Sequence, residues 1–167
     1  MNNLLAEVWI PVVPPIRSGQ HKKVVRGVRR DGTAWAGQVQ NPGYERAMGG
    51  LVQVLFQSRP DGWRPVAEPV VVGLQLFLPH LKTMPKRDRG LAIPMAKTPD
   101  WDNIAKLYGD ALTRSGWIED DKIITWGSIA KYRGPEPGIL LRMRRHLAWT
   151  WKGSDSLRTE TIVCPFE

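Results

Sequence analysis

Two short acidic segments lie close together in an otherwise basic chain. Asp100 and Asp102 bracket the start of a predicted helix, and Asp120 and Asp121 follow soon after that helix ends. Carboxylate oxygens are the ligands that Mg²⁺ prefers in proteins. The four aspartates therefore predict a site for a divalent cation. Such an ion, surrounded by basic surface, is suited to the hydrolysis of a phosphodiester.

Helix capping is a simpler explanation for the first two acids. Pro99 is tolerated at a helix entrance, which places Asp100 near the N-cap and Asp102 in the first turn. Unpaired N–H groups and the helix dipole stabilise carboxylates at both positions. Capping explains one aspartate well and the pair less well. It does not explain why Asp120 and Asp121 come directly after the helix.

A lysine shares one face of the predicted helix with two acids. Lys106 lies four residues after Asp102 and four before Asp110. It could belong to an exposed charge ladder, which contributes about 0.3–0.5 kcal/mol per pair. Alternatively, it lies beside the metal and faces a phosphate as a point charge. The spacing alone leaves both interpretations open.

The overall charge favours a polyanionic partner. Lys and Arg number 24 against 16 Asp and Glu, a formal net charge of +8. Because several of the acids belong to the cluster, the remaining surface is strongly positive, which favours nucleic acid ahead of an anionic membrane. Two segments concentrate the cations for which we expect phosphate contacts. These are Lys22, Lys23, Arg26, Arg29 and Arg30 in the first, and Lys82, Lys86, Arg87 and Arg89 in the second.

Length and composition predict one domain and no membrane association. The 167 residues suit a single core, which we expect to span residues 1–146, with a C-terminal extension at 147–167. Cys164 is the only cysteine, so no intrachain disulfide can form. The first ten residues lack the pattern of a signal peptide, and no apolar run has the length of a membrane span. We therefore expect a cytoplasmic protein.

Hydrophobic periodicity predicts an α+β fold, a small mixed or antiparallel sheet with two helices packed on it. Asp31-Gly32 is a hairpin signal within a basic ribbon at 20–40, and the connection at 80–97 is expected to be long and structureless. The predicted strands are 4–13, 69–79, 123–132 and 139–143, and the predicted helices are 44–58 and 101–114.

Tryptophan is frequent, with eight residues in the chain. We expect Trp9, Trp117 and Trp126 to be core or interface anchors. The better candidates for stacking on unpaired bases are Trp35, which lies in the basic ribbon, and Trp101, which lies between two of the acids.

The acidic helix also resembles a known signature. Residues 99–106 read Pro-Asp-Trp-Asp-Asn-Ile-Ala-Lys, followed by Asp110-Ala111-Leu112, Gly116 and Asp120-Asp121. This string is similar to the motif of the RusA-type Holliday-junction resolvases, and the similarity covers roughly residues 5–143. It departs from the family in a longer loop at 81–97 and in the tail after about Arg145.

The resemblance implies a role for each residue of the motif. Asp100, Asp102 and Asp121 match the metal-binding aspartates, Asp120 matches the neighbouring acid, and Lys106 matches a lysine important for cleavage. It implies a homodimeric endodeoxyribonuclease that uses Mg²⁺, with Mn²⁺ as the alternative, to cut opposed strands of a four-way junction in recombination and repair. Two other hypotheses stay open: a branched-DNA-binding protein that does not cut, and a nuclease of the same fold that prefers flaps or forks.

Overall fold

The computed structural model describes residues 3–16, 23–39, 42–96 and 100–146. The C-terminal extension predicted at 147–167 lies outside the described residues, as does Lys22. Among the helices of the described part, none has the length and apolar character needed to cross a membrane.

Within this part, five strands form a mixed sheet in the order β1-β7-β4-β6-β5. The central strands β4 and β6 are parallel, and the other neighbours are antiparallel. The α+β fold with a mixed sheet is thus confirmed. The strands are β1 (Leu4–Ile10), β4 (Val70–Pro79), β5 (Ile93–Pro94), β6 (Ile124–Gly134) and β7 (Gly138–Arg145).

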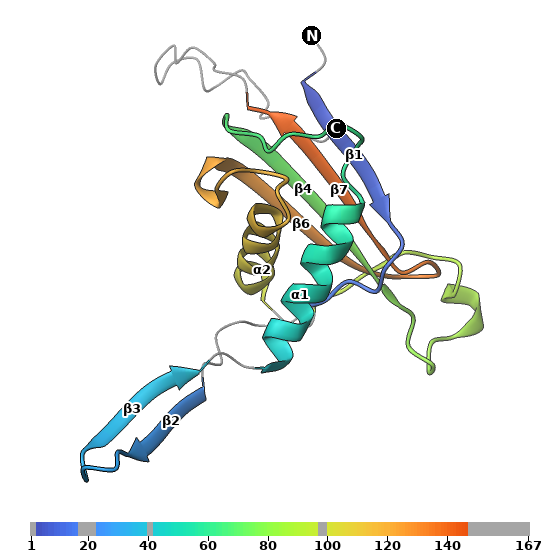
Figure 1. Cartoon of the computed structure of the whole chain (residues 1–167). Helices are drawn as coiled ribbons and strands as arrows, with labels where there is room; N and C mark the ends of the chain where they lie inside the picture. The colour runs from blue at the N-terminus through green and yellow to red at the C-terminus, as the bar shows by residue number, and fades with distance from the viewer. Residues whose placement is uncertain (1–2, 17–22, 40–41, 97–99, 147–167) are drawn as a thin grey trace, which may run out of the picture.

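Two helices, α1 (Pro42–Gln57) and α2 (Trp101–Arg114), cover one face of this sheet (Figure 1). The apolar residues that recur at helical spacing along α2 are all buried: Ile104, Leu107, Tyr108, Ala111 and Leu112. In α1, Met48, Leu51 and Leu55 are buried as the periodicity predicts, whereas Phe56 is exposed. The spacing of apolar residues therefore fixes the buried faces of both helices.

A hydrogen bond joins the segment that follows α2 to α1. Gly116 follows α2 with a φ of +71°, a left-handed conformation that glycine adopts without steric cost. The chain then turns back, and Trp117 enters the core with 0% exposure. Its Nε1 donates a hydrogen bond of 2.8 Å to the carbonyl of Leu55. This contact fixes the point from which the chain returns toward Asp120 and Asp121.

The predicted hairpin also forms. β2 (Lys23–Val28) and β3 (Ala34–Val39) pair as a separate two-stranded sheet. Asp31 and Gly32 lie in its turn, and Gly32 has a φ of +85°. Figure 1 shows the hairpin projecting away from the rest of the molecule.

The connection after β4 differs from the prediction, because it is not structureless. It contains a 3₁₀ turn, η1 (Lys86–Asp88), and β5, which pairs with β6. Local backbone hydrogen bonds explain the turn: Asp88 N–H donates to Pro85 O at 3.0 Å, and Leu91 N–H donates to Asp88 O at 3.1 Å.

Candidate functional site

The carboxylate of Asp100 is not used to cap α2. Asp100 has the extended conformation of an N-cap residue, and its carbonyl accepts from Ile104 N–H at 3.3 Å. Within the described part of the chain, however, its side chain makes no capping hydrogen bond. Asp102 lies in the first turn, and both acids are exposed. Two carboxylates therefore lie at the positive end of the helix dipole, where anions are stabilised, and Asp100 makes no capping contact there.

Asp120 and Asp121, the two acids that follow α2, lie in different environments. Asp120 precedes a second 3₁₀ turn, η2 (Asp121–Ile123), and its Oδ1 accepts from Lys122 N–H at 3.0 Å. Its Oδ2 forms an ion pair of 2.9 Å with Lys122 Nζ. The backbone hydrogen bond from Lys122, followed by the side-chain bond, lowers the pKa of the Asp120 carboxyl. Asp120 thus has a structural role in this turn.

Asp121 lies against α2 instead. A Cβ added at Gly109 would be 3.6 Å from the Cβ of Asp121 and 3.8 Å from its Oδ2. Gly109 is buried in the last half of α2, seven residues after Asp102, which places both on nearly the same side of the helix. At 1.5 Å per residue they are about 10 Å apart along the axis.

The four predicted aspartates are therefore not gathered into one group. Across residues 3–16, 23–39, 42–96 and 100–146, no three His, Cys, Asp or Glu residues lie close enough together to hold a metal ion. Asp100 and Asp102 share the start of α2, whereas Asp121 lies beside Gly109. Exposed carboxylates are nevertheless the donor set that suits Mg²⁺, so the chemistry of these residues fits the ion. Their assignment as ligands stays a prediction.

The charge ladder considered for Lys106 does not form. Among the described residues, no ion pair joins the exposed Lys106 to Asp102 or Asp110. Asp110 instead accepts a long hydrogen bond of 3.5 Å from the hydroxyl of Tyr44 on α1. Burial, and then the charge of Asp110, raise the pKa of Tyr44. Asp110 therefore helps to join the two helices, and the ladder interpretation of Lys106 loses its support.

Gly109 is the site residue that the sequence analysis missed. A glycine inside a helix lowers stability by about 0.5–1 kcal/mol relative to alanine. A glycine at such a position is therefore often required because another group packs closely against it. That signal was present in the sequence. Gly109 also lines a cavity of about 210 Å³ between α2 and β6, together with Trp101, Ala105, Gly127 and Ser128. The cavity thus borders both the start of α2 and the position of Asp121.

The predicted phosphate-binding cations occupy two exposed segments. Arg26, Arg29 and Arg30 are exposed on the hairpin, and Lys23 begins β2. The connection after β4 exposes the second set: Lys82, Lys86, Arg87 and Arg89. In the view of Figure 1 the two segments lie on either side of α1.

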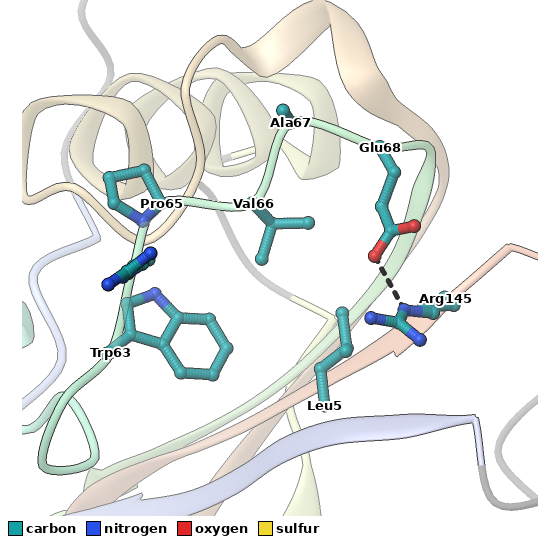
Figure 2. A pocket seen from close by; sticks show the side chains of 8 residues that line it. Leu5, Trp63, Pro65, Val66, Ala67, Glu68 and Arg145 are labelled. Atoms are coloured by element: carbon teal, nitrogen blue, oxygen red, sulfur yellow. Dashed lines mark hydrogen bonds and ion pairs between the residues drawn. The ribbon is translucent and has the colours of Figure 1, made fainter.

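A larger groove, of about 440 Å³, lies elsewhere and contains none of the predicted site residues. Figure 2 shows Leu5, Trp63 and Val66 beside it, with Glu68 and Arg145 at one side. The Glu68 and Arg145 side chains form an ion pair of 2.6 Å. Trp63 packs on Trp117 with ring centroids 4.9 Å apart. This groove therefore belongs to the packing around the end of α2.

Comparison with known families decides the identity. A model of the family described as endodeoxyribonuclease RusA matches residues 14–144, most of the chain. The chain belongs to the RusA family. Comparison with curated proteins found no match.

Membership confirms the resemblance and gives the site its general chemistry. RusA proteins are DNA-cutting hydrolases that act on branched DNA and resolve Holliday junctions, and they generally depend on a divalent metal. The match includes α2, η2 and both basic segments, so every predicted site residue falls within the RusA region.

Proposed function

We propose that this RusA-family chain is a structure-selective endodeoxyribonuclease that resolves Holliday junctions by paired, symmetric cuts during DNA recombination and repair. The observation that carries the proposal is the start of α2, where Asp100 and Asp102 are exposed and the Asp100 side chain makes no capping bond within the described residues. We further propose Mg²⁺ as the metal, with Mn²⁺ as the alternative, and a cytoplasmic location.

Asp100, Asp102 and Asp121 would hold the metal. Asp120 is the weaker candidate of its pair, because its two oxygens already contact Lys122. A bound divalent ion lowers the pKa of a coordinated water and neutralises charge on the scissile phosphate. Asp100 and Asp102 would hold the ion at the start of α2, where the helix dipole stabilises the negative side chains. Asp121 lies beside Gly109, so it would have to move toward the start of α2 to become the third ligand.

Lys106 would contact the DNA next to these acids. It is exposed one helical turn after Asp102, and no ion pair links it to either flanking acid among the described residues. A lysine ammonium is a compact positive charge that can face a phosphate oxygen. In this position it would stabilise the negative charge that builds on the phosphate as the bond to the attacking oxygen forms.

The two basic segments would supply affinity without sequence selectivity, because contacts to phosphate position a protein on DNA but do not read bases. We propose that the DNA contacts come from Lys22, Lys23, Arg26, Arg29, Arg30, Lys82, Lys86, Arg87 and Arg89. A homodimer would bring two such active sites to one junction.

The direct test is cleavage of a labelled synthetic four-way junction. With Mg²⁺ we expect paired cuts on opposed strands, and with EDTA we expect binding without cutting. A linear duplex of the same sequence and a flap substrate serve as controls. Faster cutting of the flap than of the junction would support a flap nuclease of the same fold. Binding to the junction without cutting in either Mg²⁺ or Mn²⁺ would support a protein that only binds branched DNA.

A further inference from the structure

Trp35 exposes an indole on the projecting hairpin. Its side chain is 40% exposed, although it is one of the largest apolar groups in the chain. Both strands of the hairpin have each other as their main packing partner, so the ring is not buried against the body of the protein. A large apolar side chain that stays exposed on a projecting element indicates an interaction site.

The ring is held in place from one side. Trp35 pairs with Gly27 across the hairpin, and a Cβ on Gly27 would lie 2.7 Å from Trp35 Nε1 and 3.0 Å from its Cε2. The indole therefore lies directly against the glycine backbone, at a distance that no other residue type would allow. Gly27 thus leaves room for the ring to pack on the hairpin backbone, where it has little else to pack on.

The charge around the ring fits an anionic partner. Residues 23–39 contain four basic residues and one acid, Asp31. Asp31 is hydrogen-bonded within the turn, where its Oδ1 accepts from the Thr33 hydroxyl and from Thr33 N–H at 3.0 Å. The bond from the hydroxyl, followed by the backbone bond, lowers the pKa of the Asp31 carboxyl. Arg29 is exposed two residues after Gly27, on the same face of the hairpin as Trp35, whereas Arg26, which pairs with Ala36, is exposed on the opposite face. An aromatic ring among cations is the combination that binds unpaired nucleic acid, with phosphates on the cations and a base on the ring.

We propose that Trp35 is a stacking platform for an unpaired nucleobase at the branch point of the DNA, and that it makes this protein prefer branched over linear duplex. The inference rests on the proposed function, because it assigns the selectivity of that same nuclease. In a continuous duplex the bases are stacked on one another, so no unpaired base is available to stack on the indole. At a branch point a base can leave the stack and pack on the exposed face of the indole.

The test compares Trp35→Ala and Trp35→Phe with the wild-type chain, without divalent metal. Binding to a four-way junction and to a linear duplex of equal length is measured for each. Loss of one stacked base corresponds to a loss of about 5- to 150-fold in affinity. We expect Trp35→Ala to bind the junction more weakly by this factor and to bind the linear duplex with unchanged affinity. Trp35→Phe keeps an aromatic ring, so it should keep most of the wild-type affinity for the junction. Phe56→Ala is the matched control, since it removes an exposed aromatic ring from α1, outside the hairpin.

A second readout separates stacking from loss of hairpin structure. A 2-aminopurine at the branch point should change its fluorescence on binding of the wild type and of Trp35→Phe, but not of Trp35→Ala. An unchanged salt dependence of duplex binding in Trp35→Ala would show that the hairpin arginines still reach phosphates. If Trp35→Ala loses the same affinity for the junction as for the duplex, or binds the junction as tightly as wild type, the role of Trp35 is overturned while the proposed nuclease function stands. A wild type with no preference for branched DNA would overturn both.

Discussion

Asp121 lies against Gly109 of α2, with its Cβ 3.6 Å and its Oδ2 3.8 Å from the position that a Gly109 Cβ would occupy. Both distances are ordinary van der Waals separations, so one methyl group fits against Asp121 without displacing it. The loop that follows α2 thus returns along the helix and depends on Gly109 for the room to do so. An acid far from Asp102 in sequence is thereby placed on the same side of α2.

The first prediction concerns this contact. Gly109→Ala should keep the fold and raise the free energy of unfolding by up to about 0.5–1 kcal/mol, because alanine is the better helix former. Cleavage should stay within a few-fold of wild type. Gly109→Val adds two methyl groups that have to displace Asp121 or its neighbours. It should therefore reduce junction cleavage by about tenfold or more while junction binding is kept. Thermal unfolding and cleavage assays measure both effects.

Gly49→Ala in α1 is the matched control. Apart from its chain neighbours and the nearby backbone of α1 itself, no atom of the described residues lies within 4 Å of the position of its added Cβ. It should give the same gain in stability with no change in cleavage. If Gly109→Val cuts junctions at the wild-type rate, the position of Asp121 beside Gly109 has no part in the activity.

The second prediction concerns the start of α2. Asp102→Asn should abolish cutting and leave junction binding unchanged or tighter, because a metal ligand and a charge that repels phosphate are removed together. Glu136→Gln removes an exposed acid from the turn between β6 and β7 and should leave both properties unchanged. Gel-shift and cleavage assays on the same junction separate binding from cutting. Wild-type cleavage by Asp102→Asn would show that Asp102 is not a ligand.

The third prediction separates the two adjacent acids. Asp120→Asn weakens the contacts to Lys122 that hold η2, so it should lower thermal stability slightly and reduce cleavage only in part. Asp121→Asn should abolish cleavage with little effect on stability, since Asp121 is proposed as the ligand. Melting curves and single-turnover cleavage rates compare the two variants. The reverse pattern, with cleavage abolished only in Asp120→Asn, would reassign the metal to Asp120.

The sequence predicts the elements of this fold well where periodicity and local chemistry agree. The stripe from Ile104 to Leu112 is buried because its spacing matches one face of a helix. The hairpin follows from Asp31-Gly32, since glycine accepts the positive φ that the turn requires. Trp117 is buried as expected, whereas Trp9 and Trp126 are 42% and 48% exposed and therefore lie outside the core of this chain.

Long-range placement is what the sequence does not contain. The spacing of Asp102 and Asp121 along the chain does not say where the loop after α2 returns, which Gly109 and the buried Trp117 determine in three dimensions. Likewise, β5 exists only because Ile93 and Pro94 meet β6, a contact that no local pattern predicts. The acidic pattern predicts one group of carboxylates, whereas packing separates them along α2.

The fourth prediction concerns the basic segments. Replacing Arg26, Arg29 and Arg30 together by Gln should weaken binding to junction and duplex alike, because phosphate contacts do not distinguish sequences or branches. The slope of log affinity against log salt should fall by about 0.9 for each phosphate that the variant no longer neutralises. The comparison variant replaces Lys82, Lys86 and Arg87 in the connection after β4. An unchanged slope in the first variant and a reduced one in the second would place the DNA on the connection alone.

The last prediction is a dimer. A four-way junction is close to two-fold symmetric, and its resolution needs two cuts on opposed strands. One chain contains the acidic motif once, at Asp100, Asp102, Asp120 and Asp121. Two active sites therefore require two chains, and a closed C₂ dimer is the simplest arrangement that relates them. Light scattering or sedimentation at micromolar concentration should therefore report about twice the chain mass of 18.9 kDa. In a mixture with excess Asp102→Asn chains, mixed dimers should cut one strand of the junction and leave the opposed strand intact. A protein that stays monomeric on junction DNA and cuts only once would contradict paired resolution and favour a flap nuclease.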